Sequence, residues 1–308
     1  MASGLCPDQP NWPQLPRHIQ LDVVRLLDLK SRFSLSLCSK LDNQLTSEVP
    51  FFIDVCSFHE LEGALKCYIS TSDVYFEAVR PSLPIETAAK CLPNIFKHPK
   101  TTIKELSIFN YSENDIFQSI FVTELESKGF KIRAVKVSFK KIYYEHSVLR
   151  LLELMDPLVL KKLDFENLGS DQFFNHLKHL EQWRNLEKAY ICVSGLTQVN
   201  LDDFLHINQL CINGLMDLNK ENKAKIIESF KLRDPPAGSF IHLTSSFLKN
   251  CTRVIDRELG FEKYSLPTPG NKLYIQFTEK QIIGKVIKTD RALCEKDVIC
   301  EMLQLDIF

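Results

Sequence analysis

Glycine is scarce in this 308-residue sequence, with only 10 residues, or about 3% of the chain against an average of about 7%. Loops that cradle phosphate need glycine for close backbone approach, so phosphate-binding loops are disfavoured. Dinucleotide, Walker, Gly-x-Ser-x-Gly and His-Glu-x-x-His motifs are all missing. We therefore expect a non-catalytic protein without a cofactor.

Long uncharged stretches and an excess of one charge are also missing. A charged residue interrupts every apolar stretch before the roughly 18 residues that a membrane-spanning helix requires. The formal charge of −1, from 38 basic and 39 acidic residues, argues against a dedicated nucleic-acid-binding protein. Residues 1–16 have neither a basic start nor an apolar core, so we expect no signal peptide and an intracellular protein, cytoplasmic or nuclear.

The ten cysteines include no Cys-x-x-Cys pair, the close spacing that zinc sites usually show. We expect reduced thiols that act mostly as small buried apolar groups. His176 and His179 lie beside Glu181, but no third and fourth ligands can be identified, so we predict no metal site. A Cys–His catalytic pair that meets only in space stays open as an alternative, because with ten Cys and eight His some pairs will arise by chance.

The content of 44% hydrophobic and 25% charged residues is typical of a folded protein, and the length predicts two domains or one elongated domain. Changes in composition along the chain predict its organisation. We expect a disordered N-terminus at 1–10, a helical block at 11–50, a linking β-meander and helix at 51–95, a strand–helix domain at 96–290, and a C-terminal segment at 291–308.

A repeated apolar-x-x-apolar-x-apolar frame is the most informative pattern. The frames are Ile103/Leu106/Ile108, Ile132/Val135/Val137, Leu160/Leu163/Phe165, Leu186/Ala189/Ile191 and Ile207/Leu210/Ile212. Their starts are 29, 28, 26 and 21 residues apart (132−103, 160−132, 186−160, 207−186), and helix-like stretches lie between them. This spacing predicts an α/β fold built as a leucine-rich-repeat-like strand–helix solenoid with a C-terminal β cap at 273–287. An ordinary α/β sheet gives similar spacing and remains the alternative.

Six basic residues and no acidic one lie between Lys128 and Lys141. Because the expected frame Ile132/Val135/Val137 takes the inner face of this strand, the simplest interpretation is a solvated outer face. A patch for an acidic partner is the alternative.

The helical block at 11–50 carries an apolar stripe. After Pro16, which suits a first helical turn, Ile19, Val23, Leu26 and Leu27 recur at offsets 0, 4, 7 and 8. A block of this size buries little apolar area by itself, so we expect its stripe to be covered by a partner.

The motifs of this block strongly resemble an F-box. They are Trp12-x-x-Leu15-Pro16, the Leu-Asp-Leu junction at 27–29, and Cys38-Ser39-Lys40. In that family the three-helix module docks onto the Skp-type adaptor of a cullin-based SCF ubiquitin ligase. The resemblance implies adaptor contacts by Trp12, Leu15, Pro16, Ile19, Val23, Leu26, Leu27, Leu35 and Cys38.

The remainder resembles the FTH domain of the nematode F-box A group, at 103–108, 148–152, 180–184, 204–207 and 273–277. Arg184 and Ile207 depart mildly from the pattern, where Lys and Phe are expected. The resemblance implies a substrate-recognition subunit that binds a target protein, with no nucleic acid or membrane partner. A solenoid interaction module outside a ubiquitin ligase, or a hydrolase with a clustered nucleophile and base, are the rival functions.

Residues that alternate with the frames should form an outward strip along the stacked strands. The predicted strip is Glu105, Ser107, Phe109, Ala134, Lys136, Ser138, Lys162, Asp164, Glu166, Lys188, Tyr190, Cys192, Gln209, Cys211 and Asn213. From it we predict target contacts by Phe109, Lys136, Asp164, Tyr190 and Cys211. The aromatic members are of the type that anchors protein interfaces.

Overall fold

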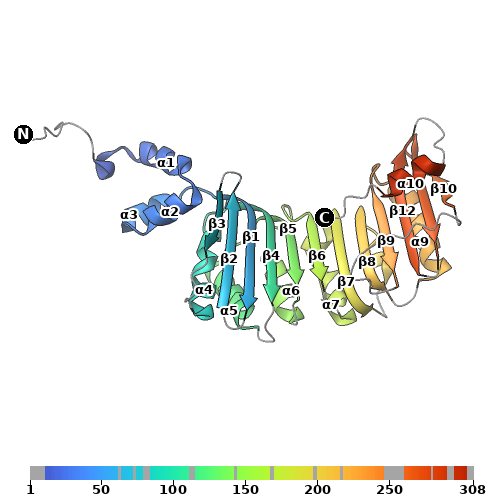
Figure 1. The fold of residues 1–308 in the computed structure, drawn as a ribbon, viewed down its shortest axis with the longest axis horizontal. Helices are drawn as coiled ribbons and strands as arrows, with labels where there is room; N and C mark the ends of the chain where they lie inside the picture. Colours follow the sequence, from blue (N-terminus) through green and yellow to red (C-terminus); the bar gives the residue numbers. More distant parts are fainter. Residues whose placement is uncertain are drawn as a thin grey trace, which may run out of the picture.

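The computed structural model describes residues 11–61, 64–71, 74–78, 84–110, 115–141, 144–166, 170–196, 200–215, 218–245, 260–278, 280–289 and 295–303. Within them an N-terminal group of helices is followed by one large mixed sheet with a helical layer (Figure 1). The expected mixed α/β class is therefore confirmed. The disorder predicted for 1–10 falls outside the described residues.

The N-terminal block contains η1 (Trp12–Gln14), α1 (Arg17–Leu26), α2 (Leu29–Ser36) and α3 (Lys40–Ser47). Side-chain caps define the starts of two helices, because the Asp28 carboxylate accepts the Ser31 N–H and the Ser39 hydroxyl accepts the Asp42 N–H. The block lies beyond one end of the sheet (Figure 1).

The described strands form one sheet of twelve in the order β10-β11-β12-β9-β8-β7-β6-β5-β4-β1-β2-β3. Their bounds are β1 (Phe52–Leu61), β2 (Ala64–Thr71), β3 (Val74–Ala78), β4 (Thr102–Asn110), β5 (Ala134–Lys140), β6 (Lys162–Glu166), β7 (Lys188–Leu196), β8 (Gln209–Leu215), β9 (Phe240–Thr244), β10 (Glu262–Ser265), β11 (Asn271–Phe277) and β12 (Gln281–Lys288). Strands β1 and β4 to β9 are parallel, and antiparallel strands flank them on both sides.

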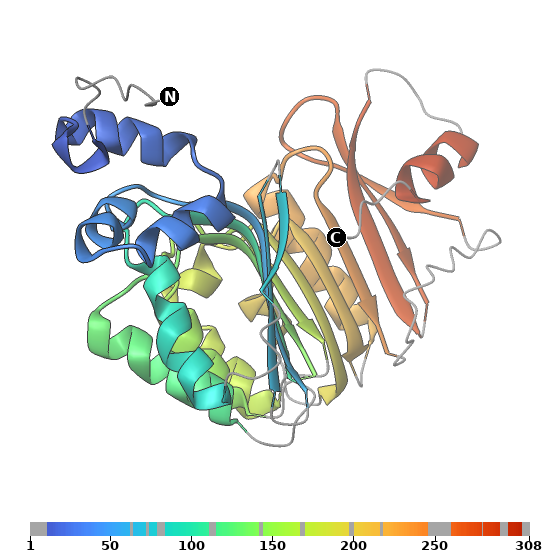
Figure 2. The ribbon, with the colours of Figure 1, turned by 60° about the vertical axis from the view of Figure 1, so that its left-hand side comes forward.

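The helical layer covers one face of the parallel strands (Figure 2). It consists of α4 (Ile85–Cys91), η2 (Leu92–Phe96), α5 (Ile116–Lys128), α6 (Glu145–Glu153), α7 (Asp171–Leu177), α8 (Glu181–Arg184), η3 (Leu201–Asp203) and α9 (Lys220–Arg233). The final helix, α10 (Glu295–Leu303), packs on the opposite face, where Val298 and Met302 contact Tyr274, Ile283 and Ile287.

The main core lies between the parallel strands and their helices. Phe58, Phe117 and Phe121 pack in it with ring centroids 5.3–5.5 Å apart. Trp183 is 2% exposed, and its indole N–H donates to the Asp203 carbonyl at 2.9 Å. Trp183 thus anchors packing in this core.

The register corrects one expected frame. Strand pairing aligns Ile103, Leu106 and Ile108 with Ala134, Val137 and Phe139, two residues later than the predicted Ile132/Val135/Val137. Ile132 is buried through a separate bridge to Met155, while Val135 is half-buried. The predicted frame is wrong by two residues because Ile132 and Val135 are also apolar, whereas the residue that truly occupies the first position is the small Ala134.

The other four frames align as expected, and the pattern extends further. Ile53, Cys56 and Phe58 of β1 pair with the first frame, and Ile241 and Leu243 of β9 pair with the last. The expected strands at 273–277 and 282–287 are β11 and β12, which pair antiparallel.

Candidate protein-binding surfaces

A small core holds the N-terminal helices together. Val24, Leu45 and Val49 are at most 3% exposed, and Trp12 and Leu35 pack partly against them. The Trp12 indole N–H donates to Asp42 Oδ1 at 2.7 Å, and the Gln20 side-chain amide donates to the Trp12 carbonyl at 2.8 Å. Trp12 and Leu35, predicted as adaptor contacts, therefore also serve the module's own packing.

Helix α1 presents a second apolar face to solvent. Leu26 is 86% exposed, Ile19 39% and Val23 37%, while Gln20 and Val24 on the other side are buried. Among the other predicted contacts, Pro16 and Cys38 are exposed, and Leu15 and Leu27 are half-buried. The described chain thus leaves the predicted stripe largely uncovered.

Two exposed apolar side chains in this block were not predicted. Leu37, after α2, is 77% exposed, and Leu41 of α3 is 39% exposed. Their only sequence signal is apolar character next to the Cys-Ser-Lys motif, because the short helices give no clear period. We define the apolar docking face as Ile19, Val23, Leu26, Leu37 and Leu41.

Arg32 of α2 joins this block to the sheet. It is 8% exposed, and its guanidinium donates to the carbonyls of Arg25, Leu27 and Pro50 at 3.0–3.1 Å. The guanidinium also lies 5.2 Å from the centroid of the Phe51 ring, which packs against the main core. Burial lowers the pKa of Arg32. No pattern in the sequence singles out this residue.

On the parallel strands, the sheet face opposite the helical layer carries three rows of side chains, one residue per strand. The amino-terminal row is Val55, Glu105, Lys136, Lys162, Lys188 and Gln209; the middle row is Ser57, Ser107, Ser138, Asp164, Tyr190 and Cys211; the carboxyl-terminal row is His59, Phe109, Lys140, Glu166, Cys192 and Asn213. The predicted strip lies in these rows with one exception on β5. Ala134 is fully buried in the core, and Lys140, which the prediction did not include, is the residue of β5 in the carboxyl-terminal row.

The middle row is largely buried, and two of the predicted target contacts lie below the surface of the sheet. Asp164 is 7% exposed and Cys211 0%, whereas Phe109, Lys136 and Tyr190 are half-buried. Most side chains of the middle row are short. The longer side chains of the two adjoining rows, such as the lysine stems, shield them from solvent. The Ser138 hydroxyl donates to Asp164 Oδ2 at 2.8 Å, and burial raises the pKa of Asp164.

The aromatic members of the strip already have partners within the sheet. The Phe109 ring stacks on His59 at 4.2 Å, and the Lys140 ammonium lies 5.6 Å from the Phe109 centroid. The Asn213 side-chain amide donates to the Tyr190 hydroxyl at 3.2 Å. These contacts make both aromatics part of the sheet surface and weaken the case for them as free anchors.

Acidic neighbours match the basic run at 128–141. Lys128, Arg133, Lys136 and Lys140 form ion pairs with Glu124, Asp156, Glu105 and Glu166 at 3.1–3.8 Å. These carboxylates would repel the phosphate backbone of a nucleic acid. The ion pairs are therefore consistent with the interpretation of the run as a solvated face.

One Cys–His contact is present in the described residues, between Cys211 Sγ and His242 Nδ1 at 3.7 Å. Both residues are at most 1% exposed, so a substrate in solvent does not reach the thiol. Cys56 is also fully buried, and the hydrogen bond that its thiol donates to Cys67, together with burial, raises its pKa, which favours the unreactive thiol.

Two further observations concern the described residues alone. No three or more His, Cys, Asp or Glu side chains converge there as metal ligands would. None of the helices in that part of the chain combines the length and apolarity needed to cross a membrane.

Comparisons with known proteins match two domains. A family model described as the F-box domain matches residues 12–54, and one described as the FTH domain matches 114–255. F-box A protein 224 from Caenorhabditis elegans is 24% identical over 142 residues, which cover 44% of this chain and 36% of that relative. The chain thus spans about a third of the length of the curated relative it matches. No solved structure matches.

Proposed function

We propose that this chain, an F-box protein with an FTH domain, is a substrate-recognition subunit of an SCF-type ubiquitin ligase. In this proposal the F-box binds a Skp-type adaptor and, through it, a cullin, while the FTH domain binds a target protein. The chain itself performs no bond chemistry. It acts by raising the effective concentration of a target lysine near the ubiquitin-loaded enzyme.

The observation that carries the proposal is the apolar docking face. Leu26 is 86% exposed and lies on the same helix face as Ile19 and Val23. Removal of these apolar side chains from water by a partner protein would be favourable in free energy. Burying one such side chain in a partner's groove contributes roughly 1.5–3 kcal/mol. Five exposed apolar side chains within one small helical block support the interpretation of the block as a docking module rather than a self-contained domain.

We also propose that the strand–helix units from β4 to β9 are repeats of the leucine-rich type. Their support is the register, in which Leu106, Val137, Leu163, Ala189 and Leu210 occupy equivalent positions on successive strands. The intervals between successive strands, taken from the same pairing, are 31, 26, 26, 21 and 31 residues (136−105, 162−136, 188−162, 209−188, 240−209). Such a stack offers a continuous surface to a target.

Co-purification with a Skp-type adaptor tests the proposal. Leu26→Glu places a charge at the most exposed residue of the docking face, and Leu232→Glu is the matched control, because Leu232 of α9 is also 86% exposed. We expect wild type and Leu232→Glu to retain the adaptor and Leu26→Glu to lose it. The loss should exceed about tenfold in affinity, since a buried leucine is exchanged for an unpaired charge.

Equal retention of the adaptor by both variants would overturn the assignment of this face. A chain that purifies without any adaptor, yet holds another protein, would favour the rival function of an interaction module outside a ubiquitin ligase.

A further inference from the structure

Helix α10 lies on the face of the sheet opposite the helical layer, over β11 and β12 (Figure 2). Its contact with the sheet is small, because Val298 and Met302, one helical turn apart, are the buried side chains among those that the structure describes in α10. The helix has nine residues, and isolated helices shorter than about 12–15 residues are marginal in water. It therefore depends on this contact to stay folded.

The sheet surface under α10 combines an apolar floor with two cations. Tyr274 of β11 and Ile283 and Ile287 of β12 are at most 5% exposed and pack against α10. Strand pairing places Lys263 of β10 and Lys285 of β12 on either side of Tyr274 in one row. These five residues, which we call the α10 site, suit a helix that carries apolar and acidic residues on one face.

Lys285 contacts the last turn of α10. It is 6% exposed, its ammonium donates to the Glu301 carbonyl, and it forms an ion pair with the Glu301 carboxylate at 3.6 Å. A buried cation requires such acceptors, and the last helical turn supplies them because its carbonyls lack intrahelical partners. The α10 site therefore selects the carboxyl-terminal turn of a helix with an acidic residue in it.

Two groups of the α10 site are not satisfied by α10. The Tyr274 hydroxyl is buried and has no hydrogen-bond partner among the described residues. Lys263 Nζ lies 5.8 Å from the centroid of the Tyr274 ring and forms no ion pair within the described part of the chain. A buried hydroxyl without a partner is costly, and a carboxylate near Lys263 would accept its hydrogen bond. A helix with one more acidic residue would thus fit the site better than α10 does.

We propose that the α10 site binds an amphipathic helix of the target protein, and that α10 covers the site until such a helix displaces it. The inference rests on the proposed function, since it names the kind of target segment that this chain takes. Like Val298, Glu301 and Met302 of α10, the target helix carries apolar residues at positions i and i+4 and an acidic residue at i+3. A second acidic residue, which reaches Tyr274 and Lys263, distinguishes it from α10.

Competition by α10 makes the site selective. Because α10 belongs to the same chain, it competes with a target helix at an effective concentration on the order of millimolar. A helix that makes only the contacts of α10 is therefore excluded at ordinary concentrations. A helix with the additional acidic contact gains the free energy that displacement requires.

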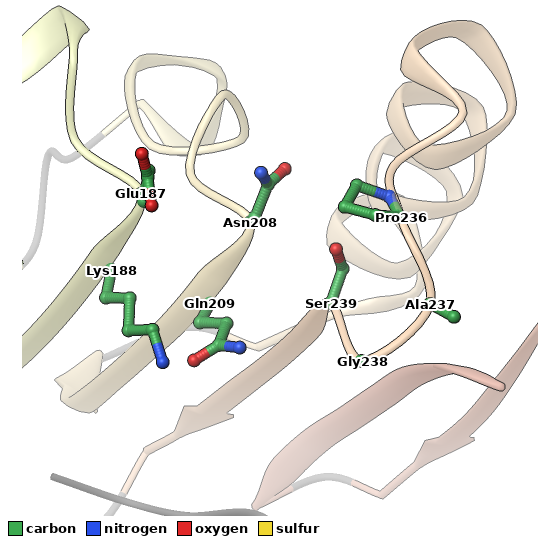
Figure 3. Close-up of a pocket in the computed structure, with 8 residues that line it drawn as sticks. All are labelled: Glu187, Lys188, Asn208, Gln209, Pro236, Ala237, Gly238 and Ser239. Carbon is green, nitrogen blue, oxygen red and sulfur yellow. The ribbon is translucent and has the colours of Figure 1, made fainter. Parts of the chain in front are cut away.

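The pocket of about 160 Å³ at the amino ends of β7, β8 and β9 is a weaker candidate for a target segment (Figure 3). Glu187 and Lys188 line it together with Asn208, Gln209 and residues 236–239. These residues carry charges of both signs and include no large apolar side chain. A protein segment therefore finds no apolar anchor there, in contrast to the α10 site.

Fluorescence anisotropy with the full chain bound to its adaptor tests the inference. The probe is a labelled peptide that carries the α10 sequence between alanine-rich flanks, with serine in place of its cysteine. In the chain, Val298→Asp with Met302→Asp releases α10 and leaves the α10 site intact, and Cys300→Asp on the exposed side of α10 is the matched control. We expect the released variant to bind the peptide at least about tenfold more tightly than wild type or Cys300→Asp, because the tethered competitor is gone.

Further changes test what the site recognises. In the released variant, Ile283→Asp should abolish binding, and Gln at the peptide position of Glu301 should weaken it, since Lys285 loses its ion pair. Among peptides with one further glutamate, at least one should bind more tightly than the original. Lys263→Glu should remove that gain, whereas Lys220→Glu on the exposed start of α9 should not.

Equal binding of the peptide to wild type and to the released variant would overturn the inference. No binding to a released variant whose circular dichroism matches wild type would overturn it too. Unfolding of the released variant would have the same consequence, because α10 would then be part of the fold rather than a cover. Loss of the adaptor from a chain that binds the peptide as expected would instead contradict only the proposed function.

Discussion

Glu60, at the end of β1, shows how strongly a single residue depends on its surroundings. It is 2% exposed, and one of its carboxylate oxygens has no hydrogen-bond partner among the described residues. Burial first, and then the negative charge of Asp115, raise its pKa from 4.5 to about 7. The folded protein therefore holds this side chain as a neutral acid at pH values where an exposed glutamate is ionised.

This raised pKa predicts a pH-dependent stability. Between pH 4.5 and about 7 the unfolded chain releases the Glu60 proton while the folded chain keeps it, so the free energy of unfolding falls as the pH rises. The loss should be on the order of 2–3 kcal/mol across this range. Urea unfolding at pH 5 and pH 8 measures it. Glu60→Gln should remove this part of the pH dependence, and an unchanged slope in that variant would refute the assignment.

At the scale of the element, the corrected frame of β5 makes a prediction of its own. Ala134 is 0% exposed and faces the core, whereas Val135 next to it is half-buried. Ala134→Leu should overpack the core and lower the free energy of unfolding by roughly 1–3 kcal/mol. Val135→Leu, a change of one methylene at the less buried position, should cost well under 1 kcal/mol. Urea unfolding distinguishes them; a larger effect at Val135 would restore the frame predicted from the sequence.

The slip in β5 also shows what apolar spacing determines. The sequence places correctly a frame that follows polar residues, such as Leu186/Ala189/Ile191 after Arg184 and Asn185, because only one register there puts apolar side chains inward. The frame of β1 was not found because its middle position is Cys56, and that of β9 because its first position is Gly238. The alternation of apolar and polar residues locates a strand in the sequence, but the register of that strand is fixed only by its pairing with the neighbouring strands.

The same limit applies to helix α1. Apolar spacing identifies Ile19, Val23 and Leu26, which lie exposed, but does not separate them from Leu27, which is half-buried. A short amphipathic helix with apolar residues on two sides does not reveal which side is covered within its own chain. The Arg32 guanidinium contacts three carbonyls that come together only in the tertiary structure, so no periodic pattern in the sequence reveals its role.

On the scale of the whole molecule, the docking block and the sheet are joined with little intervening chain. Residues matched by the F-box model run to 54, inside β1, which begins at Phe52. Arg32 contacts the Pro50 carbonyl and the Phe51 ring at this junction. The amino-terminal row starts on the same strand, at Val55. The short junction therefore joins the docking block directly to the first strand of the sheet.

The most direct test of the central claim is hydrogen–deuterium exchange of the chain with and without a Skp-type adaptor. Our account predicts slower exchange on complex formation at 15–27 and 35–41, the segments that carry the docking face, and no change in α9, whose exposed Leu232 serves as internal reference. Protection confined to the sheet or to α9, with unchanged exchange in α1, would contradict it.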